Sequence, residues 1–114
     1  MNLGFIGCGK ITSSVIAGIS KSSIKYNKIF ISERNKKISN KIKKKYKKIF
    51  IEKSNQIIID KCNWIFLAIT PKVGQRIIKD LKFKSNQTII SFISSITLPE
   101  LKRMIKVKVD LVRA

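Results

Sequence analysis

The chain has 114 residues, of which 44% are hydrophobic, so it is long enough for one domain with a packed core and is not a disordered chain. It carries 25 Lys and Arg residues against 6 Asp and Glu residues, a net charge of +19 at pH 7. It has no histidine to serve as a general base, and its two cysteines, Cys8 and Cys62, lack the spacing of zinc ligands.

Six short apolar segments are predicted to be β-strands. They lie at 2–6, 28–32, 48–52, 64–69, 87–92 and 108–112. The fourth and fifth segments are nearly continuous apolar runs, which is typical of strands that are covered on both faces.

Apolar residues recur at helical spacing between these strands. The stripes are Ile11, Val15 and Ile19; Ile38, Ile42 and Tyr46; Val73, Ile77, Ile78 and Leu81; and Leu98, Leu101 and Ile105. Thr70 is a candidate N-cap before Pro71, and Thr97 and Glu100 have the spacing of a capping box. Alternating strands and helices predict parallel βαβ units with right-handed crossovers. We therefore expect an α/β, Rossmann-like three-layer domain over residues 1–114, with one parallel sheet in the strand order 3-2-1-4-5-6.

The first predicted strand runs into a glycine motif within GFIGCGKI at 4–11. In dinucleotide-binding folds, Gly-x-Gly-x-x-Gly/Ala forms a tight turn, lets the backbone approach the pyrophosphate and allows close helix packing. Gly7 and Gly9 take the first two positions, and Thr12 takes the third, where its bulk is expected to move helix and strand slightly apart. The pair of glycines alone also fits an ordinary turn, but its place between a strand and a helix favours a cofactor site.

The second predicted strand ends in ISERN at 31–35, where NAD-binding folds place an Asp or Glu against the ribose 2′-hydroxyl. Ser32 takes that position here, and Arg34 and Asn35 follow. A hydroxyl and a guanidinium suit a 2′-phosphate, which a carboxylate would repel. We expect Glu33 to point elsewhere. The segment predicts NADP(H) rather than NAD(H), although Arg34 also fits an ordinary surface arginine.

One segment, KKISNKIKKKYKK at 36–48, holds eight lysines in thirteen residues. Its apolar stripe predicts a helix with a solvated lysine face, and an anionic partner is the alternative. Because the charge excess is nearly all lysine in a chain also rich in isoleucine and asparagine, a genome biased toward AT-rich codons explains it without a partner. We do not expect nucleic acid as the partner, since specific binders interleave aromatic residues or arginines and only Tyr46 interrupts this run.

The cysteines and the lengths of the apolar runs predict the cellular location of the protein. Two cysteines without a disulfide framework indicate the reducing cytoplasm. No apolar run approaches the roughly 20 residues that span a bilayer. The N-terminal segment enters the glycine motif directly, which is unlike a secretory signal.

Taken in chain order, these segments resemble the pyrroline-5-carboxylate reductase family. GFIGCGKI is similar to its first strand and glycine turn, SERN to its adenosine-phosphate loop, and Asn55 to an asparagine near the adenosine. WIFLAITPK is similar to a strand that usually ends in Ala-Val-Lys-Pro, TIISFISSIT to one followed by Ala-Ala-Gly, and VDLVRA to the strand before a Met-Pro-Asn segment. The resemblance implies a Rossmann domain that binds NADPH, in an enzyme that reduces 1-pyrroline-5-carboxylate to L-proline.

The resemblance also implies a C-terminal helical domain, absent from this chain, that dimerises and closes over the substrate. Homo-oligomerisation and substrate binding are therefore expected only in the full enzyme, and the chain alone is expected to be inactive. No catalytic residue and no metal ligand is assigned here. The cofactor-binding residues that the motifs and the resemblance assign are Ile6, Gly7, Cys8, Gly9, Lys10, Ile11, Ser32, Arg34, Asn35, Asn55, Ala68, Ile69, Thr70, Pro71, Phe92, Ile93 and Ser94.

Three departures from the family pattern bear on this interpretation. Thr70 replaces a lysine, which removes a charge from the cofactor-facing loop. Ile93, Ser94 and Ser95 replace Ala-Ala-Gly, which is expected to put bulk beside the nicotinamide end. The chain stops at Ala114, where the family continues toward its substrate domain.

Three alternatives remain open. Other short NADP-linked reductases, of the β-hydroxyacid dehydrogenase or coenzyme F420-linked type, share the Gly-x-Gly opening, although SERN and LVRA favour the proline enzyme. A non-catalytic nucleotide-binding remnant fits the length of the chain. A basic nucleic-acid-binding protein ranks last.

Overall fold

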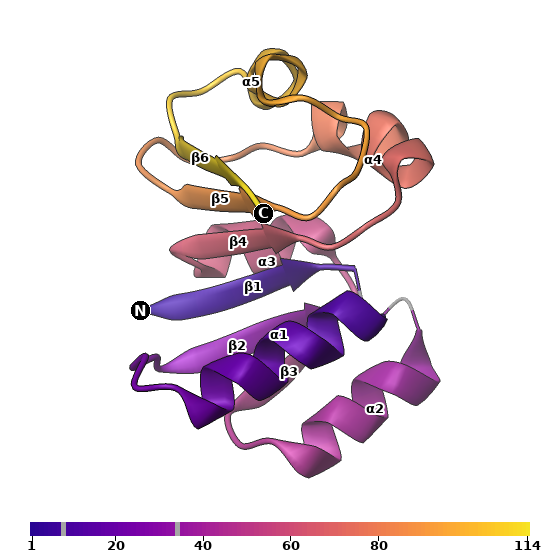
Figure 1. The fold of residues 1–114 in the computed structure, drawn as a ribbon, viewed down its shortest axis with the longest axis vertical. Helices are drawn as coiled ribbons and strands as arrows, with labels where there is room; N and C mark the ends of the chain where they lie inside the picture. The colour runs from indigo at the N-terminus through magenta and orange to yellow at the C-terminus, as the bar shows by residue number, and fades with distance from the viewer. Residues whose placement is uncertain (8, 34) are drawn as a thin grey trace.

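Six parallel strands form one sheet in the order β3-β2-β1-β4-β5-β6 (Figure 1). The computed structural model describes residues 1–7, 9–33 and 35–114. The strands are β1 (Asn2–Ile6), β2 (Lys28–Ser32), β3 (Ile49–Glu52), β4 (Trp64–Leu67), β5 (Thr88–Ser91) and β6 (Asp110–Arg113). The helices are α1 (Lys10–Lys21), α2 (Lys36–Lys45), α3 (Asn55–Lys61), α4 (Pro71–Ile77) with a 3-10 turn over Ile78–Asp80, and α5 (Leu98–Ile105). The predicted fold class and strand order are confirmed, because each neighbouring pair of strands is parallel.

Helices cover both faces of the sheet, which makes the predicted three layers. On one face, Ile16 of α1 and Ile42 of α2 are buried in a cluster with the side chains of β1 and β2. On the other face, Ile58 of α3, Ile78 and Leu101 of α5 are buried in a second cluster. In Figure 1, α1 and α2 lie in front of the sheet and α3 lies behind it. Apolar burial at roughly 25 cal/mol per Å² holds the layers together.

Two helix starts follow the predicted capping chemistry. The Thr70 side chain accepts a hydrogen bond from the Val73 N–H at 3.4 Å, and Pro71 begins α4. At α5, the Thr97 Oγ1 accepts from the Glu100 N–H at 3.3 Å, while a Glu100 carboxylate oxygen accepts from the Thr97 N–H at 3.4 Å. These bonds satisfy backbone donors that the first turn of a helix otherwise leaves without partners.

The structure differs from the sequence prediction at two helices. The buried face of α1 consists of Thr12, Ile16 and Ile19, whereas Ile11 is 45% exposed. The predicted apolar stripe therefore started at Ile11, one residue before Thr12, where the buried face of the helix starts. The helix α3 was not predicted, because Ile57, Ile58 and Ile59 are consecutive β-branched residues without helical periodicity.

All the strands run in one direction, so their carboxyl ends meet at one edge of the sheet. The chain order reverses on either side of β1, since β2 lies on one side of it and β4 on the other. Open α/β sheets bind their ligands at such a switch point. In the described part of the chain, no helix is both long and apolar enough to cross a membrane.

Candidate functional site

Two pockets lie at the carboxyl edge of the sheet. The first has a volume of about 250 Å³ and is lined by Gly7, Ser32, Lys53, Asn55, Ile69 and Ile77. The second has a volume of about 360 Å³ and is lined by Gly9, Lys10, Ile11, Ala68, Ile69, Thr70, Pro71, Phe92 and Ser94. We call them the serine pocket and the proline pocket. Both use Ile69, so they adjoin at the end of β4.

Gly7 is required by the fold of the turn itself. Its φ of +105° lies in a region that favours glycine. A Cβ atom at Gly7 would overlap the carbonyl oxygen of Ala68 and lie 2.8 Å from the Cγ2 of Ile69. The absence of a side chain therefore lets the end of β1 approach the segment after β4.

Gly9 differs from Gly7, because no described residue beyond its chain neighbours occupies the space that its Cβ would fill. No heavy atom lies within 4 Å of that position among the described residues. Gly9 is the N-cap of α1, and it provides no side chain to bond the first N–H groups of the helix. The first turn of this 12-residue helix therefore presents the positive end of its dipole and N–H donors that no side chain at the N-cap position satisfies. This arrangement suits a phosphate.

Thr12 stands at the third position of the glycine motif and is fully buried. Its hydroxyl donates a hydrogen bond to the Gly7 carbonyl oxygen at 3.3 Å. The side chain that was expected to push helix and strand apart therefore ties α1 to the turn that follows β1.

The serine pocket contains a buried polar atom with no partner. Ser32 ends β2 and is 4% exposed, and its Oγ makes no hydrogen bond within the part of the chain that the structure describes. Such an atom destabilises a protein by about 1–3 kcal/mol unless a ligand or water satisfies it. The ammonium-bearing Lys53, just after β3, and Asn55, at the start of α3, line the same pocket. A hydroxyl, an amide and a cation are suited to bind a phosphorylated ribose.

Glu33 does not line either pocket. Its backbone N–H donates to the Glu52 carbonyl oxygen at 3.0 Å, which extends the pairing of β2 with β3 by one residue. This placement agrees with the expectation that Glu33 points away from the cofactor. The described lining of the serine pocket contains no carboxylate.

The proline pocket is mainly apolar. Ala68 and Ile69 come from the end of β4, Pro71 from the start of α4, and Phe92 from the end of β5. Apolar walls at a switch point suit a flat ring and keep water away from it. Within the described lining, Lys10 is the only ionisable side chain, so the pocket has no paired acid and base of its own.

The structure describes the residues at 70 and 93–95 that depart from the expected pattern. Ile93 is 1% exposed, and a Cβ added to Gly74 would lie 3.2 Å from its Cδ1, so its bulk fills the core beneath α4 and not the proline pocket. Ser95 has a φ of +69°, a conformation that favours glycine, the residue that the resemblance led us to expect here. Thr70 lines the pocket while its hydroxyl caps α4.

Most of the predicted site residues that the structure describes gather at the two pockets. Ile6 and Ile93 do not line them, since both are core residues with at most 1% exposure. Asn35 caps α2, with its side chain accepting from the Ile38 N–H at 3.2 Å. The predicted residues Cys8 and Arg34 lie outside the described residues. Lys53 and Ile77 line the serine pocket but carry no motif that could have identified them.

Cys62 lies outside both pockets and is buried behind the sheet. Burial raises the pKa of its thiol to about 12, against a smaller lowering by Lys61. The thiol is therefore protonated at neutral pH and is not a nucleophile. Across residues 1–7, 9–33 and 35–114, no group of three His, Cys, Asp or Glu side chains could hold a metal ion.

Residues 2–95 match the model of the protein family described as NADP oxidoreductase coenzyme F420-dependent. The prediction of NADP(H) as the cofactor is confirmed at the level of this family. A comparison with curated proteins finds no significant relative.

Solved structures of longer proteins are similar to the whole chain. The 1-pyrroline-5-carboxylate reductase of Streptococcus pyogenes is 30% identical, with a TM-score of 0.77 over 99% of this chain and 41% of its own. A pyrroline-5-carboxylate reductase from Coxiella burnetii is 19% identical, with a TM-score of 0.83 over 98% of this chain and 42% of its own. The Plasmodium falciparum pyrroline carboxylate reductase, solved with NADP bound, is 23% identical, with a TM-score of 0.73 over 92% of this chain and 38% of its own. The Coxiella burnetii and Plasmodium falciparum structures support the fold alone. The chain spans about two fifths of the length of each of the three matched proteins.

Proposed function

The chain belongs to the family described as NADP oxidoreductase coenzyme F420-dependent, and from this premise we propose that its 114 residues form the NADP(H)-binding domain of a pyrroline-5-carboxylate reductase. The full enzyme would reduce 1-pyrroline-5-carboxylate to L-proline, the last step of proline biosynthesis. The likeness to the Streptococcus pyogenes reductase supports this substrate over others.

The observation that carries the proposal is the pair of pockets on either side of the glycine turn. The serine pocket, with the unpartnered Ser32 hydroxyl, would hold the phosphorylated ribose, and the open backbone at Gly9 would receive the pyrophosphate. The proline pocket would hold the nicotinamide against Phe92 and Pro71. When bound, NADPH supplies the hydride, and the residues of this chain position it and exclude water.

We propose that the isolated chain binds NADPH without turning over the imine. Hydride transfer needs donor and acceptor carbons about 3–3.5 Å apart in an oriented, dry site. The proline pocket is lined by cofactor-side residues, and its described lining offers neither a carboxylate-binding arginine nor an acid–base pair. A helical domain from a homologue, fused after Ala114, should restore reduction of 1-pyrroline-5-carboxylate.

Titration of the 114-residue chain by nicotinamide fluorescence tests the cofactor assignment. NADPH should bind more tightly than NADH, and Arg34→Ala should narrow that difference by on the order of 1.5–3 kcal/mol, as for other charge-assisted hydrogen bonds. Arg76→Ala, which removes the same charge from the exposed side of α4, is the matched control. Equal affinities for the two cofactors before mutation would contradict the assignment.

The family description favours one alternative, an NADP oxidoreductase that acts with coenzyme F420. Two parallel assays of the protein that carries the helical domain after Ala114 distinguish this alternative from the proline enzyme. Oxidation of NADPH that requires 1-pyrroline-5-carboxylate supports the proline enzyme, whereas oxidation that requires oxidised F420 supports the alternative.

We also propose a cytoplasmic location and one dinucleotide-binding domain over residues 1–114. The free, buried Cys62 thiol supports a reducing compartment. The sheet, whose strand pairing is continuous from β3 at one edge to β6 at the other, supports a single unit. Homo-oligomerisation would belong to the longer enzyme.

A further inference from the structure

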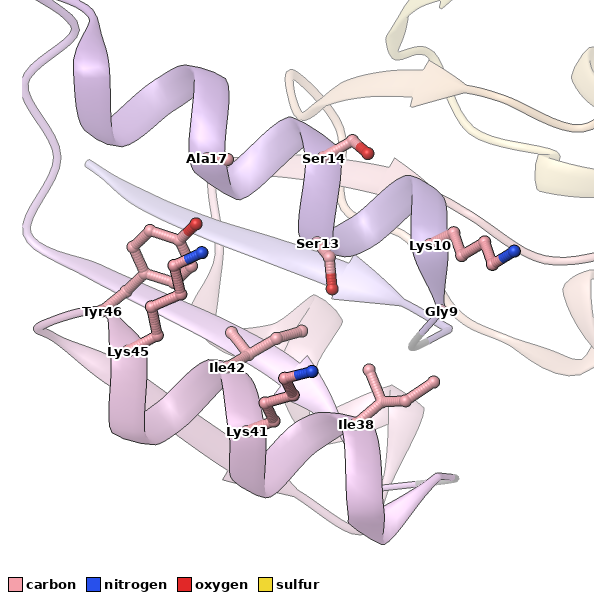
Figure 2. A pocket seen from close by; sticks show the side chains of 10 residues that line it. All are labelled: Gly9, Lys10, Ser13, Ser14, Ala17, Ile38, Lys41, Ile42, Lys45 and Tyr46. Atoms are coloured by element: carbon pink, nitrogen blue, oxygen red, sulfur yellow. The ribbon is translucent and has the colours of Figure 1, made fainter.

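A third cavity, of about 490 Å³, lies between α1 and α2; it shares Gly9 and Lys10 with the proline pocket, and its other lining residues have no role in the proposed function (Figure 2). Its lining consists of Gly9, Lys10, Ser13, Ser14 and Ala17 from the start of α1, and of Ile38, Lys41, Ile42, Lys45 and Tyr46 from α2. We call it the interhelical groove. Apart from Lys10 at one end, the residues of α1 and its N-cap that line the groove have small side chains or none.

The floor of the groove is apolar. Ile38 and Ile42 are four residues apart, which places them in one row along α2, and Tyr46, the C-cap of the helix, lines the groove after them. Ile42 is 3% exposed, whereas Ile38 and Tyr46 are only partly buried. The apolar stripe of the lysine-rich segment therefore remains incompletely covered along the groove.

Three lysines also line the groove. Lys41 and Lys45 are also four residues apart, and Figure 2 shows both side chains extending from α2 toward α1. Lys10 lies at the other end of the groove, beside Gly9. Within the described residues, these three ammonium groups form no salt bridge, and the groove has no carboxylate in its lining.

We infer that the interhelical groove is a docking surface for an acidic amphipathic helix of a partner protein. Two rows on one side of the groove repeat at helical spacing: the apolar row from Ile38 to Tyr46 covers about 12 Å, and the pair Lys41 and Lys45 covers about 6 Å. A helix with leucines at i and i+4 and glutamates beside them matches both rows, in the manner of helices that bind in hydrophobic grooves.

Charge excludes a second copy of this chain as the occupant. The net charge is +19, and each of its helices contains at most one carboxylate. Two such chains repel each other and offer no acidic helix to the groove. A nucleic acid is also a poor match, because its phosphates cannot cover the apolar floor and the lining offers one aromatic ring, Tyr46, for stacking.

Fluorescence anisotropy of a labelled 16-residue peptide tests the inference at 150 mM salt. The probe carries leucine at helical spacing and glutamate at the flanking positions; a scrambled peptide of the same composition and a 16-nucleotide single strand are the comparisons. We expect the helical peptide to bind at least fivefold more tightly than the scrambled one. Equal binding of both peptides, or tighter binding of the oligonucleotide, would overturn the inference.

Two double variants separate the groove from the overall charge. Lys41→Gln with Lys45→Gln should weaken binding of the helical peptide about fivefold, as for two partly exposed ion pairs. Lys37→Gln with Lys44→Gln removes the same charge from exposed positions of the same helix outside the groove, and it should leave the affinity within twofold. Equal losses in the two variants would show that net charge alone attracts the peptide.

A third variant tests the shape of the groove. Ala17→Phe places a large ring in the groove without changing the charge. It should abolish the preference for the helical peptide over the scrambled one. Circular dichroism and a thermal scan establish that each variant folds, and a folded Ala17→Phe variant that keeps the preference would contradict the assigned position.

Discussion

The serine pocket and the proline pocket share the residue Ile69 and one edge of the sheet, but they differ in chemistry. The first contains a lysine and a buried hydroxyl that has no partner among the described residues, whereas the second is walled mainly by apolar side chains. Their glycines differ too, since Gly7 is packed against Ala68 and Gly9 faces open space. The comparison teaches that packing within the protein requires glycine at position 7, whereas it leaves position 9 open for the ligand that we propose.

Gly7→Ala should have the largest effect, because it disturbs both pockets through the fold. The new methyl group would overlap the Ala68 carbonyl and would hold alanine at a φ of +105°. We expect a loss of about 3 kcal/mol of stability, from backbone strain and steric overlap together. Urea denaturation followed by circular dichroism measures it. A loss below about 1 kcal/mol would show that the turn relaxes freely.

Gly9→Ala should separate binding from stability. Its methyl group meets no protein atom, and alanine readily adopts the extended φ of −158°, so the free energy of unfolding should change little. The methyl group does fill the space that we assign to the pyrophosphate, so NADPH affinity should fall by on the order of tenfold. The same titration on wild-type protein is the reference, and unchanged affinity would place the pyrophosphate elsewhere.

Lys53→Gln should act on the serine pocket alone. The lysine lines that pocket and is absent from the proline pocket, so its loss should weaken NADPH binding about threefold and leave NADH binding unchanged. Lys79→Gln removes an exposed charge from the 3-10 turn, outside both pockets, and serves as the control. Similar losses for NADPH and NADH would mean that Lys53 does not distinguish the 2′-phosphate.

Ser95→Gly should have the smallest effect, and on stability rather than binding. Serine is held at a φ of +69°, which glycine adopts without strain. We expect a gain of about 0.5 kcal/mol, after allowing for the greater freedom of glycine in the unfolded chain. Ser94→Gly, at a neighbouring position without a positive φ, should instead lose stability. A thermal scan of both variants distinguishes the two outcomes.

Much of the fold was predictable, because it rests on short-range signals. Alternating apolar segments identified all six strands, and the caps at Thr70 and Thr97 identified the starts of α4 and α5. Each of these signals depends on residues within one helical turn or one strand. The helix α3 was missed for the same reason, since its three consecutive isoleucines have no local period; the tertiary structure buries Ile58 and Ile59 and leaves Ile57 40% exposed.

The candidate site was predictable in part. The glycine motif and the ends of β2, β4 and β5 contributed most of the residues that line the two pockets. Lys53 was not foreseen, because only the pairing of β3 with β2 brings it beside Ser32. Ile93 was predicted to bind the cofactor, but its side chain packs in the core beside Gly74, which has no side chain to exclude it.

By itself, the sequence determined the alternation of strands and helices, the glycine turn and the prediction of a phosphate-bearing cofactor, since each depends on the conformational preferences of adjacent residues. The tertiary structure alone decided which face of α1 is buried, how Thr12 ties the helix to the turn, and where Lys53 lies. It also decided that a groove remains between α1 and α2. These features depend on side chains that meet across elements distant in the chain, and packing at such contacts is set by the whole sheet.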